Sequence, residues 1–140
     1  IMSVEQNKQI VRRYQEIYNS NNLEALLEVV SEDLLTPKIM PGIPHGIAGA
    51  KAAHQIMLAG FPDYQTVIDD LIAERDKVAA RITMSGTNTG AFMGISPTGK
   101  FISFTGIYIA RIEDGKIVEH WGEEDSASLL SQLGVLPRLG

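Results

Sequence analysis

The chain has 140 residues, of which 44% are apolar and 21% are charged, so it is long enough for one domain with a sizeable core. A net charge of −5 without any basic run argues against nucleic-acid binding, because the surface needed to neutralise phosphates is missing. The absence of cysteine excludes disulfides, thiolate metal sites and a cysteine nucleophile.

The hydropathy of the sequence does not suggest a membrane protein. No apolar run approaches the ~20 residues that a membrane-spanning helix needs. The first residues lack the basic and apolar regions of a signal peptide. We therefore expect a cytoplasmic protein with no membrane partner, folded as one domain over residues 1–140.

The first 60 residues predict three helices. Ser3 and Gln6 form a capping box ahead of a helix whose apolar residues recur at helical spacing. The pair Asn21-Asn22 ends this helix and begins a short second one. A short strand over residues 34–40 and a Pro/Gly-rich loop over 41–46 come next, and a third helix over residues 48–59 ends at Gly60.

The rest of the chain predicts antiparallel strands over residues 64–74, 78–88, 101–111 and 116–121, followed by a short helix that Asp125 or Ser126 caps. Asp114-Gly115 predicts a tight hairpin turn between the last two strands, since a type I′ turn needs positive φ at both central residues. Helices segregated from strands indicate an α+β fold, and three long strands can curl around the helices to form a cone with a cavity.

Residues able to move protons gather where the last strand ends. His120 suits a proton shuttle, because its reference pKa of ~6.5 lies near neutrality. A carboxylate on an apolar cavity wall has a raised pKa and can act as acid or base. Because side chains alternate along a strand, His120, Gly122 and Glu124 are expected on the same face. A bulge near Gly122 would break this alternation, so which acid faces inward stays open among Glu123, Glu124 and Asp125.

Other candidates lie on the neighbouring elements. Arg81 either holds a carboxylate or enolate oxygen or forms a surface ion pair. Thr105 and Tyr108 lie on opposite faces of their strand, so at most one lines the cavity. Trp121 is expected in the core or the cavity wall. Tyr14 and Tyr18 of the first helix either belong to the core or contact a ligand.

The three histidines do not predict a metal site, because none is spaced from another as close metal ligands are. His54 is expected on the solvated side of the third helix. His45 lies in the Pro/Gly-rich loop, either as part of a lid or simply exposed. The glycine-rich stretch 86–90 matches no nucleotide-binding motif.

A set of segments spread over almost the whole chain resembles one known family. These segments are Gly60-Phe61-Pro62-Asp63, Asp70-Leu71-Ile72-Ala73-Glu74, Val78-Ala79-Ala80-Arg81, Gly86-Thr87-Asn88-Thr89-Gly90, residues 93–100, Phe104-Thr105-Gly106 and residues 114–121. They are similar to the SnoaL-like polyketide cyclase and ester cyclase family, which has the cone-shaped α+β barrel of nuclear transport factor two.

The resemblance implies ring closure of a polyketide ester by intramolecular aldol condensation, without a metal or organic cofactor. It implies an acid near the end of the His-Trp strand, and therefore His120, Glu124 and Asp125 as catalytic residues. Tyr14, Tyr18, Arg81, Thr105 and Trp121 are then expected to bind a small hydrophobic substrate. The chain departs from the family pattern at Gly122, where the cyclases carry Asp, and at Leu35-Thr36-Pro37, where many relatives have an Asp-His pair.

The leading expectation is therefore cofactor-independent acid–base chemistry, either aldol cyclisation or isomerisation, on a small hydrophobic carbonyl compound. One alternative is a non-catalytic module of the same fold that binds a small molecule. A second is an epoxide hydrolase, which needs an Asp–Arg–Asp set that Arg81 and Asp125 match only in part. The resemblance also implies a homodimer formed through the open face of the sheet.

Overall fold

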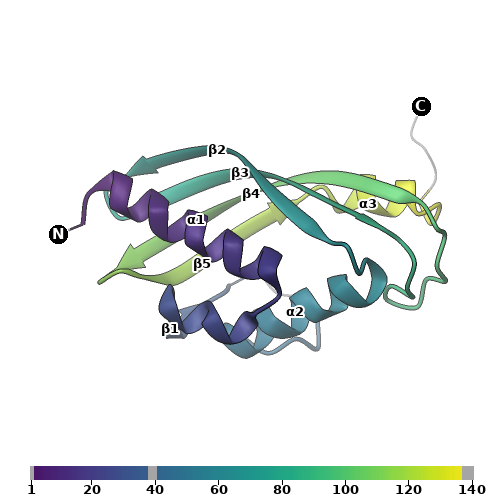
Figure 1. Cartoon of the computed structure of the whole chain (residues 1–140), viewed down its shortest axis with the longest axis horizontal. Coiled ribbons are helices and arrows are strands. Elements are labelled where there is room, and N and C mark those ends of the chain that lie inside the picture. The colour runs from purple at the N-terminus through teal and green to yellow at the C-terminus, as the bar shows by residue number, and fades with distance from the viewer. Residues whose placement is uncertain (1, 38–40, 137–140) are drawn as a thin grey trace.

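The computed structural model describes residues 2–37 and 41–136, and it has the expected α+β architecture (Figure 1). The part of the predicted strand that covers residues 38–40 lies outside this description. The elements in chain order are α1 (Val4–Ser20), the 3₁₀ helix η1 (Leu23–Glu28), β1 (Val30–Leu35), α2 (Gly46–Gly60), β2 (Gln65–Glu74), β3 (Lys77–Thr87), β4 (Phe101–Glu113), β5 (Lys116–Glu124) and α3 (Ser126–Gln132).

The predicted start and end of α1 are both confirmed. Ser3 Oγ accepts a hydrogen bond from the Gln6 amide at 3.1 Å, and Gln6 Oε1 accepts one from the Ser3 amide at 2.8 Å. Asn21 ends the helix with a φ of 62°, a left-handed conformation that Asn tolerates. The second helix is a 3₁₀ helix of six residues rather than an α-helix, as is common for short connecting pieces.

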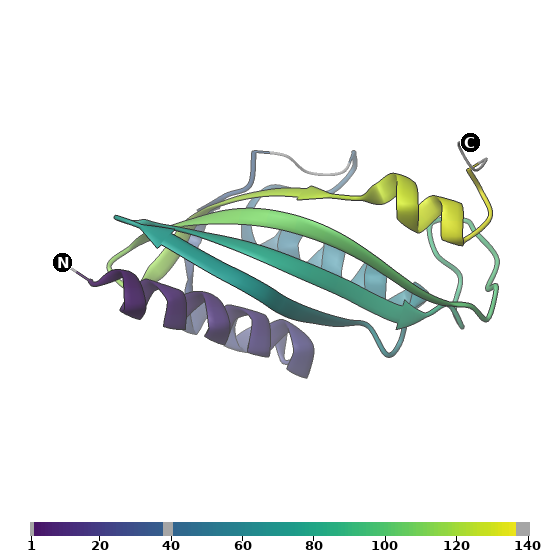
Figure 2. The ribbon, with the colours of Figure 1, turned by 90° about the horizontal axis from the view of Figure 1, so that it is seen from above.

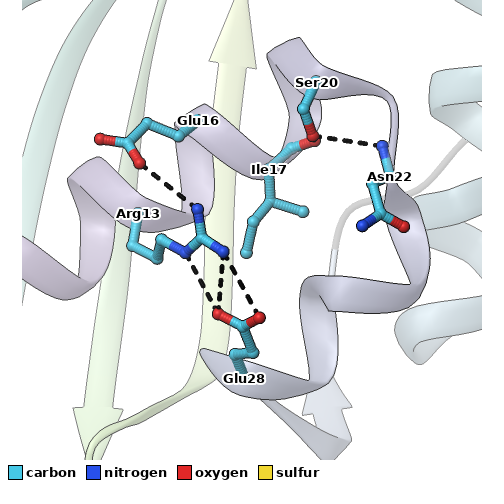
Figure 3. A network of polar contacts seen from close by, with 6 residues as sticks. All are labelled: Arg13, Glu16, Ile17, Ser20, Asn22 and Glu28. Carbon is cyan, nitrogen blue, oxygen red and sulfur yellow. Dashed lines mark hydrogen bonds and ion pairs between the residues drawn. The ribbon is translucent and has the colours of Figure 1, made fainter.

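An exposed ion pair links α1 to η1 (Figure 3). The Arg13 guanidinium donates to both carboxylate oxygens of Glu28, at 3.1 to 3.4 Å, and lies 3.5 Å from Glu16. Ser20 Oγ accepts from the Asn22 amide at 3.2 Å, where the chain turns. Because exposed ion pairs add little stability, this network orients the two helices more than it stabilises them.

Five strands form one sheet in the order β1-β5-β4-β3-β2. All neighbours are antiparallel except β1, which runs parallel to β5. The predicted hairpin turn is present, with φ of 50° at Asp114 and 78° at Gly115. Figure 2 shows that the sheet is strongly curved, with α1 running along it and α3 beyond the end of β5.

Alternation along the central strands divides the sheet into an inner and an outer face. On β4 every second residue from Ile102 to Ile112 is buried, and the residues between them are exposed or half-buried. The inner face packs against Val11 and Ile17 of α1 and supplies most of the core. Among the described residues, no helix is long and apolar enough to cross a bilayer.

The side chain of Asn88 ties the loop after β3 to the end of α2. It is completely buried and makes four hydrogen bonds. Its Nδ2 donates to the carbonyls of Gly60 (3.2 Å) and Gly90 (3.0 Å). Its Oδ1 accepts from the Thr98 amide (2.8 Å) and the Thr98 hydroxyl (2.9 Å). The Gly60 carbonyl also accepts from the Gly90 amide at 3.2 Å, so the Asn88 side chain adds to an existing backbone link between the two segments.

We expect Asn88→Ala to lower the free energy of unfolding by about 2–4 kcal/mol, because it leaves buried backbone groups unpaired. Asn88→Asp should be at least as costly, since carboxylate oxygens would then face the two carbonyls. Urea unfolding of both variants measures this, with the exposed neighbour Thr89→Ala as the control. Equal stabilities for Asn88→Ala and Thr89→Ala would contradict the assigned role.

Candidate active site

A cavity of about 440 Å³ lies between the helices and the inner face of the sheet. α1 contributes Tyr14 and Tyr18 to its wall, and α2 contributes a side made mostly of small and apolar residues. All five strands contribute to the rest of the wall, including Leu34 of β1 and Thr66 of β2. Most of the lining is apolar or aromatic, and the residues on which the argument depends are Tyr14, Gln15, Tyr18, His54, Tyr64, Tyr108, His120, Gly122 and Glu124.

Aromatic rings form a continuous line along this wall from β5 to α2. The ring centre of His120 lies 4.7 Å from that of Tyr108 and 5.8 Å from that of Tyr14. Tyr14 packs edge-on against Tyr18 at 4.9 Å, and Tyr18 against His54 at 5.0 Å. Burial raises the pKa of each of these three tyrosines, so their hydroxyls stay protonated and can donate hydrogen bonds.

His120 is held as a neutral imidazole. Part of its surface borders the cavity, but protein surrounds the ring closely enough that burial lowers its pKa to about 4. Burial disfavours the charged form of any base in this way. Near neutral pH this ring can therefore both donate and accept a hydrogen bond, but it carries no charge.

Glu124 shows the opposite shift. The residue is more exposed than His120, yet its carboxyl group loses enough water against the cavity wall that its pKa is raised above the usual value. A histidine is ordinarily the stronger base of such a pair by about two pKa units. The two shifts narrow this gap, because burial weakens His120 as a base and strengthens the Glu124 carboxylate as one.

Gly122 lies between these two residues on β5 and lines the cavity. A Cβ at position 122 would lie 3.4 Å from His120 Cε1 and 3.8 Å from Tyr108 Cβ, so a larger residue would project beside the imidazole. A strand rises about 3.3 Å per residue, which separates the Cα atoms of His120 and Glu124 by about 13 Å. A flat ligand can therefore lie across Gly122 and reach both groups.

The structure brings only some of the sequence-predicted residues together. His120, Glu124, Tyr14 and Tyr18 line the cavity, and Glu123 lines it as well. The pairing of β5 with β4 is regular from His120 to Glu124. The side chain of Asp125 instead caps α3, where it accepts a hydrogen bond from the Ser128 amide at 3.0 Å.

Three further candidates lie on the outer face of the sheet. Arg81 pairs with Asp70 at 2.8 Å, which is the surface ion pair that the sequence left open as an alternative. Thr105 is exposed, and the buried Tyr108 is the one of this pair that lines the cavity. Trp121 is half-exposed and donates to Glu119 Oε2 at 3.0 Å.

The expected position of His54 on the solvated side of α2 is wrong. His54 is only 6% exposed, lines the cavity, and lies 2.9 Å from Asn21 Oδ1 through its Nε2. Burial lowers its pKa. Ala50, Ala53 and Met57 flank it at helical spacing, and this stripe was the signal for an inward face. His45 is exposed, immediately before α2.

Gln15 and Tyr64 also line the cavity although the sequence did not single them out. Gln15 follows Tyr14 on α1 and is buried. Because its side chain is polar, the sequence did not predict this burial. Within residues 2–37 and 41–136, no three His, Asp or Glu side chains are grouped so that they could hold a metal ion.

The sequence model of the SnoaL-like polyketide cyclase family matches residues 8–133. The chain belongs to this family. It is 30% identical over 122 residues to the nogalonic acid methyl ester cyclase of Streptomyces nogalater, covering 84% of this chain and 89% of that protein. It is 27% identical over 129 residues to an aklanonic acid methyl ester cyclase of Streptomyces peucetius, covering 89% and 88%.

Among solved structures, TsrD from Streptomyces laurentii is similar to this chain with a TM-score of 0.86 and 32% sequence identity, covering 97% of this chain and all of TsrD. The α+β fold expected from the resemblance is thereby confirmed.

We expect His120 to remain neutral well below pH 6.5. At pH 5.5 an ordinary imidazole is about nine-tenths protonated, whereas His120, with a pKa of about 4, should still show the chemical shift of the neutral ring. An NMR titration of the ring protons, assigned with His120→Phe, measures this. A midpoint near pH 6.5 would contradict the burial of His120.

The lowered pKa of His120 makes the stability of the fold depend on pH. Below about pH 6.5 the unfolded chain binds a proton on His120, whereas the folded chain does not. The free energy of unfolding that this residue contributes is therefore fully present above pH 6.5 and is lost as the pH falls toward 4. Wild type should therefore lose more stability than His120→Phe across this window.

Proposed function

We propose that this protein is a cyclase that closes a ring in a small polyketide ester by general acid–base catalysis. The observation that carries the proposal is the pair of opposite pKa shifts at Glu124 and His120, on either side of Gly122 in an apolar cavity. Such divergent shifts assign acid and base roles to neighbouring groups.

In the proposed reaction, the Glu124 carboxylate takes a proton from a carbon next to a carbonyl group. The carbanion attacks a second carbonyl of the same molecule, forming the new carbon–carbon bond. The oxygen of that carbonyl then receives the proton from Glu124, so the enzyme returns to its starting state. Neutral His120 donates a hydrogen bond to the enolate oxygen while its charge develops.

The charge of the cavity favours an ester over a free acid. Glu123 and Glu124 are the charged residues of its described lining, and no Lys or Arg is among them. A substrate carboxylate would therefore lose water without gaining a partner. Both curated relatives described above are named as methyl ester cyclases, which agrees with a neutral ester substrate.

Glu124 takes over the role that the family pattern gives to an acid at position 122. The two positions share a strand face, so a carboxylate at 124 still points to the same cavity. The longer Glu side chain shortens the distance to a ligand lying over Gly122. An epoxide hydrolase is not supported, because Arg81 and Asp125 are absent from the described lining of the cavity.

The glycine at position 122 favours one alternative, a module that binds the same ligand without converting it. In that case the cavity would hold a polyketide ester, but no group at position 122 would transfer protons. This alternative predicts that the protein binds the ester but does not convert it.

We expect Glu124→Gln to lower kcat for nogalonic acid methyl ester by about 10²–10⁴-fold, because it removes the proton carrier. His120→Phe should lower kcat by about 10²–10³-fold, as for loss of an oxyanion donor. Asp125→Asn, at the adjacent acid that caps α3, should change kcat less than about twofold. Steady-state conversion followed by absorbance measures all three.

Two results would decide against this assignment. Full activity of Glu124→Gln together with a loss in Asp125→Asn would move the base to Asp125. Binding of the ester by wild type without any turnover would favour the binding module.

We also propose that the protein forms a homodimer through the outer face of the sheet. Ile72, Ala79, Ile109 and Trp121 are aligned in register across four neighbouring strands. Ile72 is 71% exposed, Ile109 42% and Trp121 50%. A contiguous apolar row of this kind on a single chain is typical of a surface that another protein covers.

We expect Ile109→Lys to shift the protein from dimer to monomer at micromolar concentration, since it places a charge at the middle of this row. Sedimentation velocity measures the change. Met93→Lys is the matched control, because Met93 is 62% exposed but lies in the loop after β3. A monomeric wild type, or a dimeric Ile109→Lys, would contradict the proposed interface.

A further inference from the structure

Gln15 is a buried polar residue of α1 that lines the cavity wall. It is only 7% exposed. Its Oε1 accepts a hydrogen bond from the Tyr108 hydroxyl at 3.2 Å. This contact joins α1 to β4, and the ring of Tyr108 lies against His120.

The amide nitrogen of Gln15 is not used in this contact. No hydrogen bond among the described residues has Gln15 Nε2 as its donor. Among the described residues, the fully enclosed polar side-chain atom without a partner is Asn7 Oδ1, so Gln15 Nε2 is not completely enclosed by protein.

Two hollows meet at Gln15. It lines the cavity, and together with Thr66 it also lines a polar groove between α1 and β2. Tyr108 lines the cavity but not the groove. Because Tyr108 belongs to the cavity wall, its hydrogen bond to Oε1 anchors the Gln15 amide at the cavity.

We propose that Gln15 is a substrate-binding residue, and that its amide N–H donates to a carbonyl oxygen of the ligand in the cavity. This inference rests on the proposed function, because it takes the ligand to be a polyketide ester rich in carbonyl groups. Tyr108 then acts as a positioning residue. By donating its hydroxyl proton to Oε1, it fixes the amide with the nitrogen available to the ligand.

This arrangement adds a third polar contact to the site. An aldol closure must hold one molecule with two carbonyl groups at a fixed separation. His120 and Glu124 act at β5, and Gln15 would hold a further oxygen from the side of α1. The substrate would thus be fixed between the sheet and the helix rather than by β5 alone.

The test compares Gln15→Leu, Tyr108→Phe and the double variant in two measurements. The first is the free energy of unfolding, and the second is the Kd of nogalonic acid methyl ester by calorimetry. Gln15→Leu leaves the buried Tyr108 hydroxyl without an acceptor, and adding Tyr108→Phe removes that hydroxyl. The double variant should therefore recover most of the lost stability.

Affinity should behave differently from stability. We expect the double variant to bind the ester about 5- to 20-fold more weakly than wild type, because the amide donor is still missing. Gln15→Glu keeps an oxygen for Tyr108 but replaces the amide nitrogen, and it should weaken binding at least as much. Asn7→Leu is the matched control. It removes another buried amide of α1, one that donates to the Arg75 carbonyl and does not line the cavity, so it should lower stability but not affinity.

The outcomes separate this inference from the proposed function. If wild type does not bind the ester at all, both are overturned. If wild type binds it and the double variant binds equally well, only the role of Gln15 is overturned, and Gln15 serves to satisfy Tyr108. If the double variant recovers its stability but still binds the ester more weakly than wild type, Gln15 contacts the ligand directly.

Discussion

Removal of water from the inner face of the curved sheet is the constraint on which the site depends. The helices close this face over a space that stays empty of side chains, partly because Gly122 has none. Burial shifts the pKa of several groups at the cavity toward the neutral form, namely Tyr14, Tyr18, Tyr108, His54, His120 and Glu124. The same packing that gives the domain its core thus sets the proton affinities available for chemistry.

The fold could be predicted from the sequence because its signals are local. Alternation marks β3, β-branched and aromatic residues mark β4, the capping box starts α1, and Asp114-Gly115 sets the hairpin. The site could be predicted only in part. Parity along β5 placed His120 and Glu124 on one face, and both line the cavity, although Glu123 of the other parity lines it too. Asp125 follows the last strand residue, and its use as a helix cap removes it from the cavity.

The other differences between the predicted and the observed site come from contacts between segments that lie far apart in the sequence. The choice for Arg81 depended on which face β3 presents to α1, and alternation alone does not give that direction. His54 and Gln15 are polar residues on helices, and each is buried by a partner far along the chain, Asn21 or Tyr108. A sequence read without its tertiary contacts assigns such residues to the solvent.

The pH dependence of kcat/KM for nogalonic acid methyl ester tests the account most directly. We predict a single limb that rises with pH through an apparent pKa above the usual value of about 4.3 for Glu, since the free carboxylate is the base. The limb should disappear in Glu124→Gln and persist in His120→Phe. A limb near pH 6.5 that disappears in His120→Phe would contradict the account, because a charged or ordinary histidine would then be the proton carrier.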